Sequence, residues 1–258
     1  MKQVTLDPFV DDHLNLQVQL SYADHHDFLL RHGLAECRRV LDVGTGNGTF
    51  AARLGSDHPQ IDFLGIDKRA PCVESCRQWT QPNFSARQGD LFARNLDLEL
   101  ASFDGILMRY FLLHVDHAHK ILERLRREGK RPSRLWVIDL DWSQFTCAPM
   151  HPAFALLTDL VRAFCAKVSV DTAGGQNVVP LLRQCGFQNI VTEARPFTSI
   201  TMPRETFAQY LRQEVLCYAR MMAVDPAPEI LRFIDEEVRT GGCEISYGMG
   251  LVSACLTK

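Results

Sequence analysis

The sequence predicts an α/β fold with a doubly wound, mainly parallel sheet, an N-terminal helical cap and helical insertions near the C-terminus. Two observations predict it. Apolar, strand-like runs alternate with helical patterns between residues 38 and 142, which is typical of parallel sheets covered by helices on both faces. The first apolar run then breaks into glycines at alternate positions, Gly44, Gly46 and Gly48. Such sheets bind ligands beyond the carboxyl ends of their strands, so we expect the functional site at that edge.

The first half of the chain supplies the cap and the core of the sheet. Residues 1–37 are mostly helical in pattern and precede the first strand, so they can fold over its end. The core, which we expect to bind the cofactor, covers residues 38–142. Its strands are expected over residues 39–44, 61–67, 84–90, 103–110 and 134–141, and its helices over residues 47–56, 70–80 and about 114–128.

The second half, residues 143–258, adds two helical insertions to the sheet. They span residues 145–175 and 200–242, and each carries an apolar stripe at helical spacing that we interpret mainly as core packing. A short helix that stops near Gly186, a sixth strand in "NIVTEARPF" and a last strand over residues 245–256 complete the fold. We expect a single domain, because 258 residues suit one large core.

Charge and composition disfavour several classes of function. The formal net charge is -3 and no Lys/Arg-rich run forms a binding stripe, so no nucleic-acid partner is expected. The N-terminus has no apolar signal-peptide segment, and no apolar run approaches the roughly 18 residues of a membrane span. Nine scattered cysteines favour a reducing, cytoplasmic location. Cys72 and Cys76 lack a second pair to complete a zinc site, so no metal is expected.

The loop "VLDVGTGNGTF", residues 40–50, indicates the kind of ligand. A dinucleotide-binding fingerprint needs Gly-x-Gly-x-x-Gly, but here the third glycine comes one residue early. A P-loop is excluded because no Gly-Lys-Ser/Thr follows. Asp42, two residues before the first glycine, would repel a pyrophosphate and attract a cationic ligand. S-adenosylmethionine fits this loop, because it carries an ammonium and a sulfonium but no phosphate.

Two further acids follow at the expected strand ends. Asp67 ends the second strand, where its carboxylate can accept hydrogen bonds from both ribose hydroxyls of the cofactor; the alternative is a surface turn acid. Asp90, in "GDLF" at the third strand end, is placed to accept from the adenine amino group; the alternative is a turn-forming aspartate. Three acids in this order, each at a strand end, are a stronger indication together than any one alone.

With these motifs the sequence resembles the class I, Rossmann-like, S-adenosylmethionine-dependent methyltransferases of the small-molecule type. The resemblance rests on "VLDVGTGNGTF", "FLGIDKRAPCVESCR", "RQGDLF", "FDGILMRYFLLHV" and "LWVIDLD", and it covers residues 38–142 well. It implies a seven-stranded sheet whose last strand runs antiparallel between strands five and six. It also implies a set of cofactor-binding residues: Asp42, Gly44, Thr45, Gly46, Asn47, Gly48, Asp67, Lys68, Asp90, Leu91, Met108 and Arg109.

The resemblance assigns a part of the cofactor to each strand end. The glycine loop wraps the methionine part, Asp67 takes the ribose, and Asp90 with Leu91 takes the adenine. The backbone around Met108 and Arg109 lines the methionyl end. One motif departs from the family, because "MRYFLLHV" stands where base and amide N-methyltransferases carry Asn-Pro-Pro-Tyr. This departure disfavours an adenine, cytosine or glutamine acceptor.

Methyl transfer from a sulfonium mainly needs a positioned acceptor, and a general base helps when the acceptor is a hydroxyl or an acidic carbon. The candidate catalytic residues are His114 near the fourth strand end, and Tyr22 and His25 in the cap. A structural alternative stays open for His114, which would begin a helix and bond to its backbone, and Tyr22 is a candidate to close over the cofactor. Because His25 and His26 are adjacent on a helix, at most one of them can face the site.

Arg109 also has two open roles. A guanidinium at the fourth strand end can bind the carboxylate of the cofactor. It can equally pair with an acid of the cap, for which Asp11 and Asp12 are the candidates. The two roles differ in whether the cation remains free to bind a ligand.

The insertions decide the acceptor, because they bring side chains that can line an apolar pocket: Phe145, Met150, Phe154, Phe164, Phe207, Tyr210, Met221 and Met222. We expect a methyltransferase acting on the O-, N- or C-nucleophile of a small molecule, in secondary metabolism, and leave a homodimer open. The alternative is an enzyme of the same fold that cyclises or cleaves the cofactor chain and releases methylthioadenosine. A protein that only binds the cofactor is the third possibility.

Overall fold

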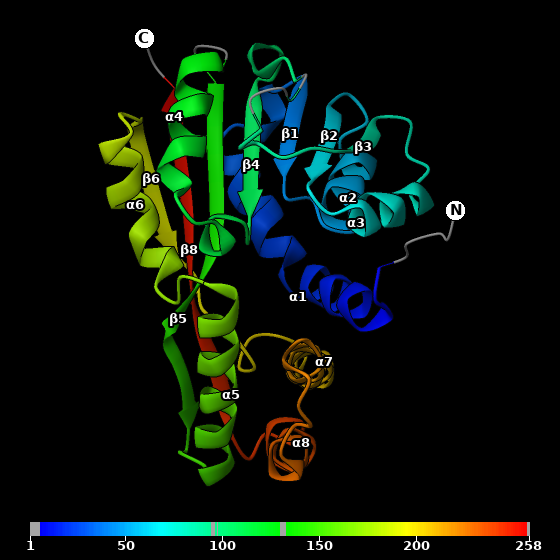
Figure 1. The fold of residues 1–258 in the computed structure, drawn as a ribbon, viewed down its shortest axis with the longest axis vertical. Helices are drawn as coiled ribbons and strands as arrows, with labels where there is room; N and C mark the ends of the chain where they lie inside the picture. The colour runs from blue at the N-terminus through cyan, green and yellow to red at the C-terminus, as the bar shows by residue number, and fades with distance from the viewer. Residues whose placement is uncertain (1–5, 94–95, 97, 130–132, 257–258) are drawn as a thin grey trace.

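The computed structural model of the chain describes residues 6–93, 96, 98–129 and 133–256, and its centre is one sheet covered by helices (Figure 1). The strand order is β3-β2-β1-β4-β5-β8-β6, and the two-residue β7 pairs with β8. The strands are β1 Arg39–Val43, β2 Asp62–Asp67, β3 Phe84–Gln88, β4 Gly105–Arg109, β5 Ser133–Ala148, β6 Gln188–Ala194, β7 Phe197–Thr198 and β8 Glu244–Leu256. The expected doubly wound, seven-stranded sheet is thus confirmed, with β7 as a short addition.

Strand direction also follows the expectation. Neighbours among β1 to β5 pair in parallel, and β8 runs antiparallel between β5 and β6. The chain leaves β1 towards β2 and β3 on one side and returns to β4 on the other. This reversal next to β1 is the switch point at which doubly wound sheets open a crevice beyond their carboxyl ends.

Alternating side chains divide the core between the two faces of the sheet. Val40 in β1 and Trp136 in β5 pack in a buried cluster with helices α1 and α2, whereas Leu41 and Leu135, one residue away, pack beneath α4 and α6. The helices are α1 Pro8–Arg31, α2 Thr49–Asp57, α4 Ala118–Glu128 and α6 Gly174–Gln184. Both faces are therefore covered by apolar side chains, as a parallel sheet requires.

Two helices of the first half are shorter than their patterns suggest. The helix expected over residues 70–80 is α3, Ala70–Ser75, followed by a 3-10 turn over Cys76–Gln78. The stretch expected to be helical from residue 114 begins as a 3-10 turn, Leu112–His114, and α4 begins only at Ala118. The chain must turn sharply as it leaves β4, and Tyr110 takes a left-handed φ of 51° there.

The fifth strand continues well beyond its expected end. We expected a strand over residues 134–141 and a helical insertion from residue 145, but β5 runs to Ala148 and α5 spans Pro152–Val168. The strand continues because β8 pairs with it along its length, with a register shift between Asp141 and Thr146. Figure 1 shows this β5–β8 ribbon extending past the rest of the sheet to the helices α5, α7 and α8.

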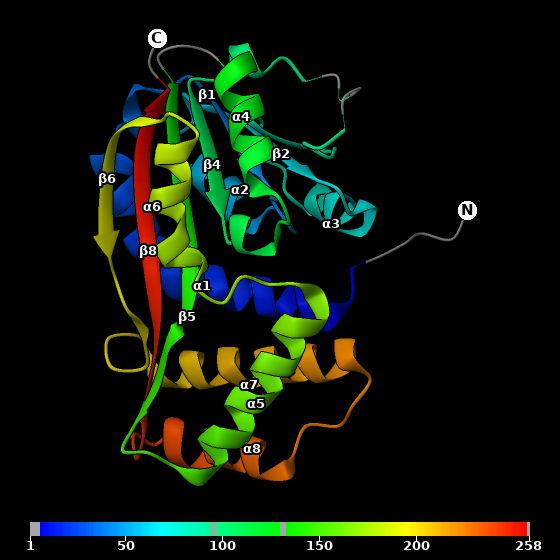
Figure 2. The ribbon, with the colours of Figure 1, turned by 60° about the vertical axis from the view of Figure 1, so that its left-hand side comes forward.

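The second insertion, expected over residues 200–242, contains α7 Arg204–Met222, α8 Pro228–Phe233 and a π-helical turn Ile234–Val238. Together with α5 these helices form a layer beyond the carboxyl ends of β1 to β4 (Figure 2). No helix in the part of the chain that the structure describes is long and apolar enough to cross a membrane.

The cap is one 24-residue helix, α1, which lies between the sheet and α7 (Figures 1 and 2). It begins at Pro8, where the Asp7 carboxylate accepts a hydrogen bond from the Phe9 amide at 3.0 Å. Gln213 and Cys217 of α7 both donate hydrogen bonds to the carbonyl oxygen of Phe9, so the start of the cap is fixed to the last long helix. Its second half is core, since Phe28 and Leu29 are fully buried.

Candidate functional site

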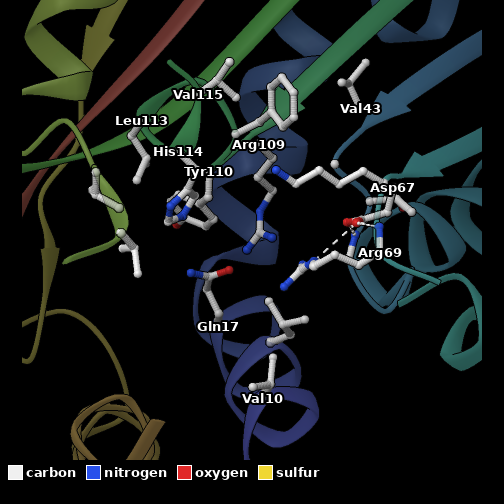
Figure 3. Close-up of a pocket in the computed structure, with 18 of the residues that line it drawn as sticks. Val10, Gln17, Val43, Asp67, Arg69, Arg109, Tyr110, Leu113, His114 and Val115 are labelled. Atoms are coloured by element: carbon white, nitrogen blue, oxygen red, sulfur yellow. Dashed lines mark hydrogen bonds and ion pairs between the residues drawn. The ribbon is translucent and has the colours of Figure 1, made fainter. Parts of the chain in front are cut away.

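A cavity of about 380 Å³ lies at the carboxyl ends of β1, β2 and β4, beneath α1 and against α5 and α7 (Figure 3). One end is polar and is formed by the loops that follow the strands. The other end is largely apolar and is formed by Leu140 and Trp142 of β5 with side chains of α5 and α7. The cavity thus joins the expected ligand edge of the sheet to the helical insertions.

The glycine loop forms the floor of the polar end. The amide nitrogens of Gly44 and Thr45 donate to the Ile66 carbonyl oxygen at 2.8 and 3.0 Å, which ties the loop to the end of β2. Gly46 has φ +60°, and a β-carbon there would come 3.2 Å from Leu14 of α1, on a wall of the cavity. Glycine is needed because the loop combines a left-handed backbone with a close approach to the cap.

Asp67 ends β2 at the edge of this floor and is 6% exposed. One carboxylate oxygen accepts from the Gly46 amide at 3.2 Å, and the other from the Arg69 amide and guanidinium Nε at 2.9 and 3.3 Å (Figure 3). Lys68 and Arg69 also line the cavity. A ribose bound to Asp67 would therefore lie near two basic side chains, and it would share the carboxylate with Arg69.

The loop that follows β3 contributes Asp90 and Leu91 to the cavity wall. Asp90 is exposed, and one of its carboxylate oxygens accepts a hydrogen bond from the Phe92 amide at 2.8 Å. Leu91 is buried, and both residues line the cavity. The turn-forming role that we left open for Asp90 is thus present, and its second oxygen has no hydrogen-bond partner among the described residues.

The expected cofactor residues divide into those on the wall and those behind it. The cavity is lined by Gly44, Thr45, Gly46, Asn47, Asp67, Lys68, Asp90, Leu91 and Arg109. Asp42, Gly48 and Met108 are not part of the lining. Burial raises the pKa of Asp42 to about 6, against the opposing effects of the Thr45 hydroxyl and the Arg109 charge. Asp42 therefore lies buried behind the cavity wall.

Arg109 points from the end of β4 into the cavity above Gln17 (Figure 3). Its Nε donates to His25 Nδ1 at 3.2 Å, and a terminal nitrogen donates to the Ser21 hydroxyl at 3.1 Å. Neither Asp11 nor Asp12 pairs with it among the described residues, and Asp11 instead accepts from the Asn47 amide group at 3.0 Å. Among the described residues Arg109 forms no ion pair, so its charge is available to an anionic group of a ligand.

The three candidate bases lie in different surroundings. His114 lines the cavity beside Tyr110 (Figure 3), and desolvation followed by the charges of Arg69 and Lys68 lowers its pKa, which favours a neutral imidazole. Tyr22 does not line the cavity and donates to the Asp57 carboxylate of α2 instead.

His25 also lies outside the lining, fully buried between Arg109 and the Met249 sulfur. Burial and then the Arg109 charge hold its pKa well below the usual value, so Nδ1 can accept from the guanidinium. The adjacent His26 faces the other way and contacts His58 at 2.7 Å between the two Nε2 atoms. The expectation that the two histidines point to different sides is met.

The sequence analysis missed Glu214, a carboxyl in the wall of the apolar end. It is 2% exposed, and it accepts hydrogen bonds from the hydroxyls of Tyr210, Tyr218 and Tyr247. A signal was present, because Tyr210, Glu214 and Tyr218 follow one another at intervals of four residues along α7. An acid with a tyrosine four residues before it and another four residues after it indicates a polar cluster on one face of the helix.

The glycine loop after β1, the acid at the end of β2 and the antiparallel strand between β5 and β6 define the fold of the class I S-adenosylmethionine-dependent methyltransferases. Residues 35–186 match the family model described as a methyltransferase domain. The match covers more than half of the chain, so the chain belongs to this family, as the sequence motifs implied.

Individual relatives are distant. The chain is 27% identical to methyltransferase str2 of Strobilurus tenacellus over 151 residues, 58% of the chain and 53% of that protein. It is 33% identical to O-methyltransferase rstn1 of Aspergillus nomiae over 106 residues, 40% of the chain and 47% of that protein. The chain thus spans about half the length of these relatives. The solved structure of YcgJ from Bacillus subtilis shares the fold with a TM-score of 0.58 and 19% identity, covering 91% of this chain and 99% of that one.

Proposed function

We propose that the chain transfers the methyl group of S-adenosylmethionine to a small-molecule acceptor. The observation that carries the proposal is the continuous cavity, which extends from the glycine loop and Asp67 to an apolar wall at α5 and α7. Membership of the methyltransferase family identifies S-adenosylmethionine as the ligand for the polar end. The apolar end leaves space for a second molecule beside it.

The residues of the polar end fit this cofactor. Gly46 keeps the loop surface free of a β-carbon, which favours close passage of the methionyl chain. Asp67 offers carboxylate oxygens to the ribose hydroxyls, and Asp90 with Leu91 forms an edge for the adenine. Arg109 offers a guanidinium without a carboxylate partner to the carboxylate of the methionyl end.

When bound, the cofactor supplies a methyl group that is already activated on a positively charged sulfur. The chain has to orient the acceptor and exclude water. Helix α1 covers the cavity with Val10, Leu14 and Val18, which are apolar. His114 stays a candidate base at the wall, whereas His25 supports Arg109 from behind and Tyr22 fastens α1 to α2.

The nature of the acceptor is a finer part of the proposal. Likeness to O-methyltransferase rstn1 favours a hydroxyl nucleophile, and the enclosed apolar end favours a molecule of small size. A place in secondary metabolism, a cytoplasmic location, a homodimer and the lack of a nucleic-acid partner stay predictions from the sequence.

Two measurements test the proposal. Calorimetry with adenosylhomocysteine should show binding to the wild-type chain, and Arg109→Met should weaken it by about tenfold or more, the loss expected for one charge-assisted hydrogen bond. Chromatography of the nucleoside product should then show adenosylhomocysteine only when an acceptor is present. Rapid formation of methylthioadenosine from the cofactor alone would replace methyl transfer with cyclase or lyase chemistry.

A further inference from the structure

Glu214 is a buried carboxyl in the cavity wall that the proposed cofactor site does not use. Tyr210 and Tyr218 donate to its Oε1 at 2.9 and 3.0 Å, and Tyr247 of β8 donates to Oε2 at 2.8 Å. A carboxylate has about four acceptor positions, so three tyrosine hydroxyls leave one position on Oε2. This position belongs to a group that lines the cavity.

Glu214 forms no ion pair with any of the residues that the structure describes. Its hydrogen bonds come from hydroxyls, and the titratable groups that interact with it besides Tyr210 and Tyr218 are weak acids: Tyr110 after β4, Cys165 of α5, Cys217 of α7 and Tyr247 of β8. Burial raises the pKa of Glu214 to about 7 despite its three hydrogen bonds. Near neutral pH the carboxyl can therefore both accept and release a proton.

His13 of α1 lies in the same wall of the cavity. Its ring stacks on Tyr210 at 4.9 Å, and its Nδ1 is a buried atom without a hydrogen-bond partner among the described residues. Burial, followed by the Arg109 charge, lowers the pKa of His13 to about 4, so the imidazole is neutral. The neutral His13 ring therefore adds no charge to this wall of the cavity.

Aromatic rings form the rest of this end. Phe164 of α5 and Tyr218 of α7 stack with ring centres 3.9 Å apart and planes 11° apart, and the Trp142 ring lies 6.3 Å from Tyr218. All three line the cavity, with Leu140 and Val168 beside them. Rings of this kind favour a flat, apolar molecule, because such a molecule can bury its faces against them.

We propose that Glu214 takes the proton from the nucleophilic hydroxyl of a flat aromatic acceptor that binds against Trp142, Phe164 and Tyr218. The inference rests on the proposed function and names its substrate class. As the acceptor O–H bond breaks, the proton goes to the Glu214 carboxylate and the electron pair forms the new O–CH₃ bond. The S–CH₃ bond breaks with its electron pair remaining on sulfur, and Glu214 later releases the proton to water.

A hydroxyl suits the site better than an ammonium for two reasons. The carboxylate is already built to accept from hydroxyls, since three tyrosines donate to it. The same cavity contains the Arg109 guanidinium, which forms no ion pair among the described residues and would repel a second cation.

The first test is binding, in the presence of adenosylhomocysteine, of 2-naphthol and of its methyl ether, 2-methoxynaphthalene. Wild-type protein should bind 2-naphthol about tenfold more tightly than the ether, as one hydrogen bond to a charged group implies. Glu214→Gln should abolish this preference. Glu205→Gln, which changes an exposed glutamate of the same helix, should keep it. Equal affinities in the wild type, or no binding of either naphthalene, would overturn the proposal.

The second test is transfer of a labelled methyl group to 2-naphthol and to 2-naphthylamine. The wild type should methylate the naphthol, and Glu214→Gln should lower kcat by about 100-fold or more, the range of general base catalysis, with unchanged adenosylhomocysteine affinity. Glu214→Asp should restore part of the rate. Naphthol that binds but is not methylated, methylation of the amine alone, or full activity of Glu214→Gln would each overturn the proposal.

A pH profile separates a proton acceptor from a merely structural carboxyl. For the wild type kcat/KM should rise through the pKa of Glu214, near pH 7. Tyr218→Phe removes one donor to Oε1, which raises that pKa further and should move the rising limb to higher pH. An unmoved limb would count against Glu214 as the base. Failure of adenosylhomocysteine to bind at all would instead reject the proposed function on which the inference rests.

Discussion

The two ends of the cavity are built from different parts of the chain. The polar end comes from short loops that follow β1, β2, β3 and β4, so its groups lie within one continuous stretch between Gly44 and His114. The apolar end comes from β5, α5 and α7, and its rings and its buried carboxyl meet only through packing between distant segments. A common cofactor can be held by local motifs, whereas an individual acceptor needs a surface assembled from several elements.

Valine at Gly46 should have the largest effect and should act on the polar end alone. The loop backbone has φ +60° there, and a branched side chain would project between the loop and Leu14. We expect adenosylhomocysteine affinity to fall by about 100-fold or more, while stability falls by about 1–3 kcal/mol from backbone strain. Calorimetry and urea unfolding measure the two changes. Unchanged affinity would remove the loop from the cofactor site.

Replacing Glu214 should change the pH dependence of stability at the apolar end. Folding raises its pKa from 4.5 to about 7, so the folded chain binds more protons than the unfolded chain between these values and stability falls as pH rises across that window. Glu214→Gln should remove this loss and be more stable than wild type at pH 8 by up to about 3 kcal/mol.

Urea unfolding at pH 4 and pH 8 measures this difference, because the contribution of Glu214 disappears below the unfolded-state pKa of 4.5. Glu205→Gln serves as the control and should show no such dependence. If Glu214→Gln is less stable than wild type at pH 8, the hydrogen bonds of the carboxylate stabilise the fold by more than its burial destabilises it.

A smaller effect is expected at Asp67. Asp67→Asn replaces one acceptor oxygen with an NH₂ donor. Because Gly46 and Arg69 both donate hydrogen bonds to this carboxylate, one of these donors would lose its acceptor. Loss of charge-assisted hydrogen bonds to the ribose should weaken adenosylhomocysteine binding by about 1.5–3 kcal/mol. Asp62→Asn, at the exposed start of the same strand, is the matched control. Equal affinities of the two variants would place the ribose elsewhere.

The smallest effect concerns the cap, because only part of α1 borders the cavity. The residues of α1 that border the cavity lie within residues 8–18, whereas residues 19–31 contribute to the core. Adenosylhomocysteine should therefore slow amide hydrogen exchange in residues 8–18 and leave residues 19–31 nearly unchanged. Slowing along the whole helix would mean that the cap closes as one rigid unit.

Sequence reasoning reached the polar end because its chemistry is local. Gly44, Gly46, Asp67 and Asp90 each stand at a strand end that apolar patterning locates, and the structure has all four on the cavity wall. Their roles towards the cofactor stay predictions. The role of Arg109 was left open between a ligand and the cap, and it contacts cap residues that had not been considered as its partners.

The apolar end was less predictable because it depends on pairing over long distances. The fifth strand was expected over residues 134–141, but its continuation to Ala148 is fixed by β8, about 100 residues later in the chain. Tyr22 and His25 were chosen because the cap precedes the first strand, yet the rotation of α1 turns them away from the cavity. Glu214 was not considered, because helical spacing alone does not show which groups of other elements meet it.

The attachment of α1 to α7 has a consequence for how the chain matures during synthesis. Helix α1 leaves the ribosome early, but Gln213 and Cys217, which bind the carbonyl of Phe9, are translated some 200 residues later. A nascent chain that stops before residue 204 has the complete glycine loop and the strands β1 to β5, but one side of its cavity is missing. The polar end of the cavity can therefore form while translation continues, and the apolar end closes only when the chain is nearly finished.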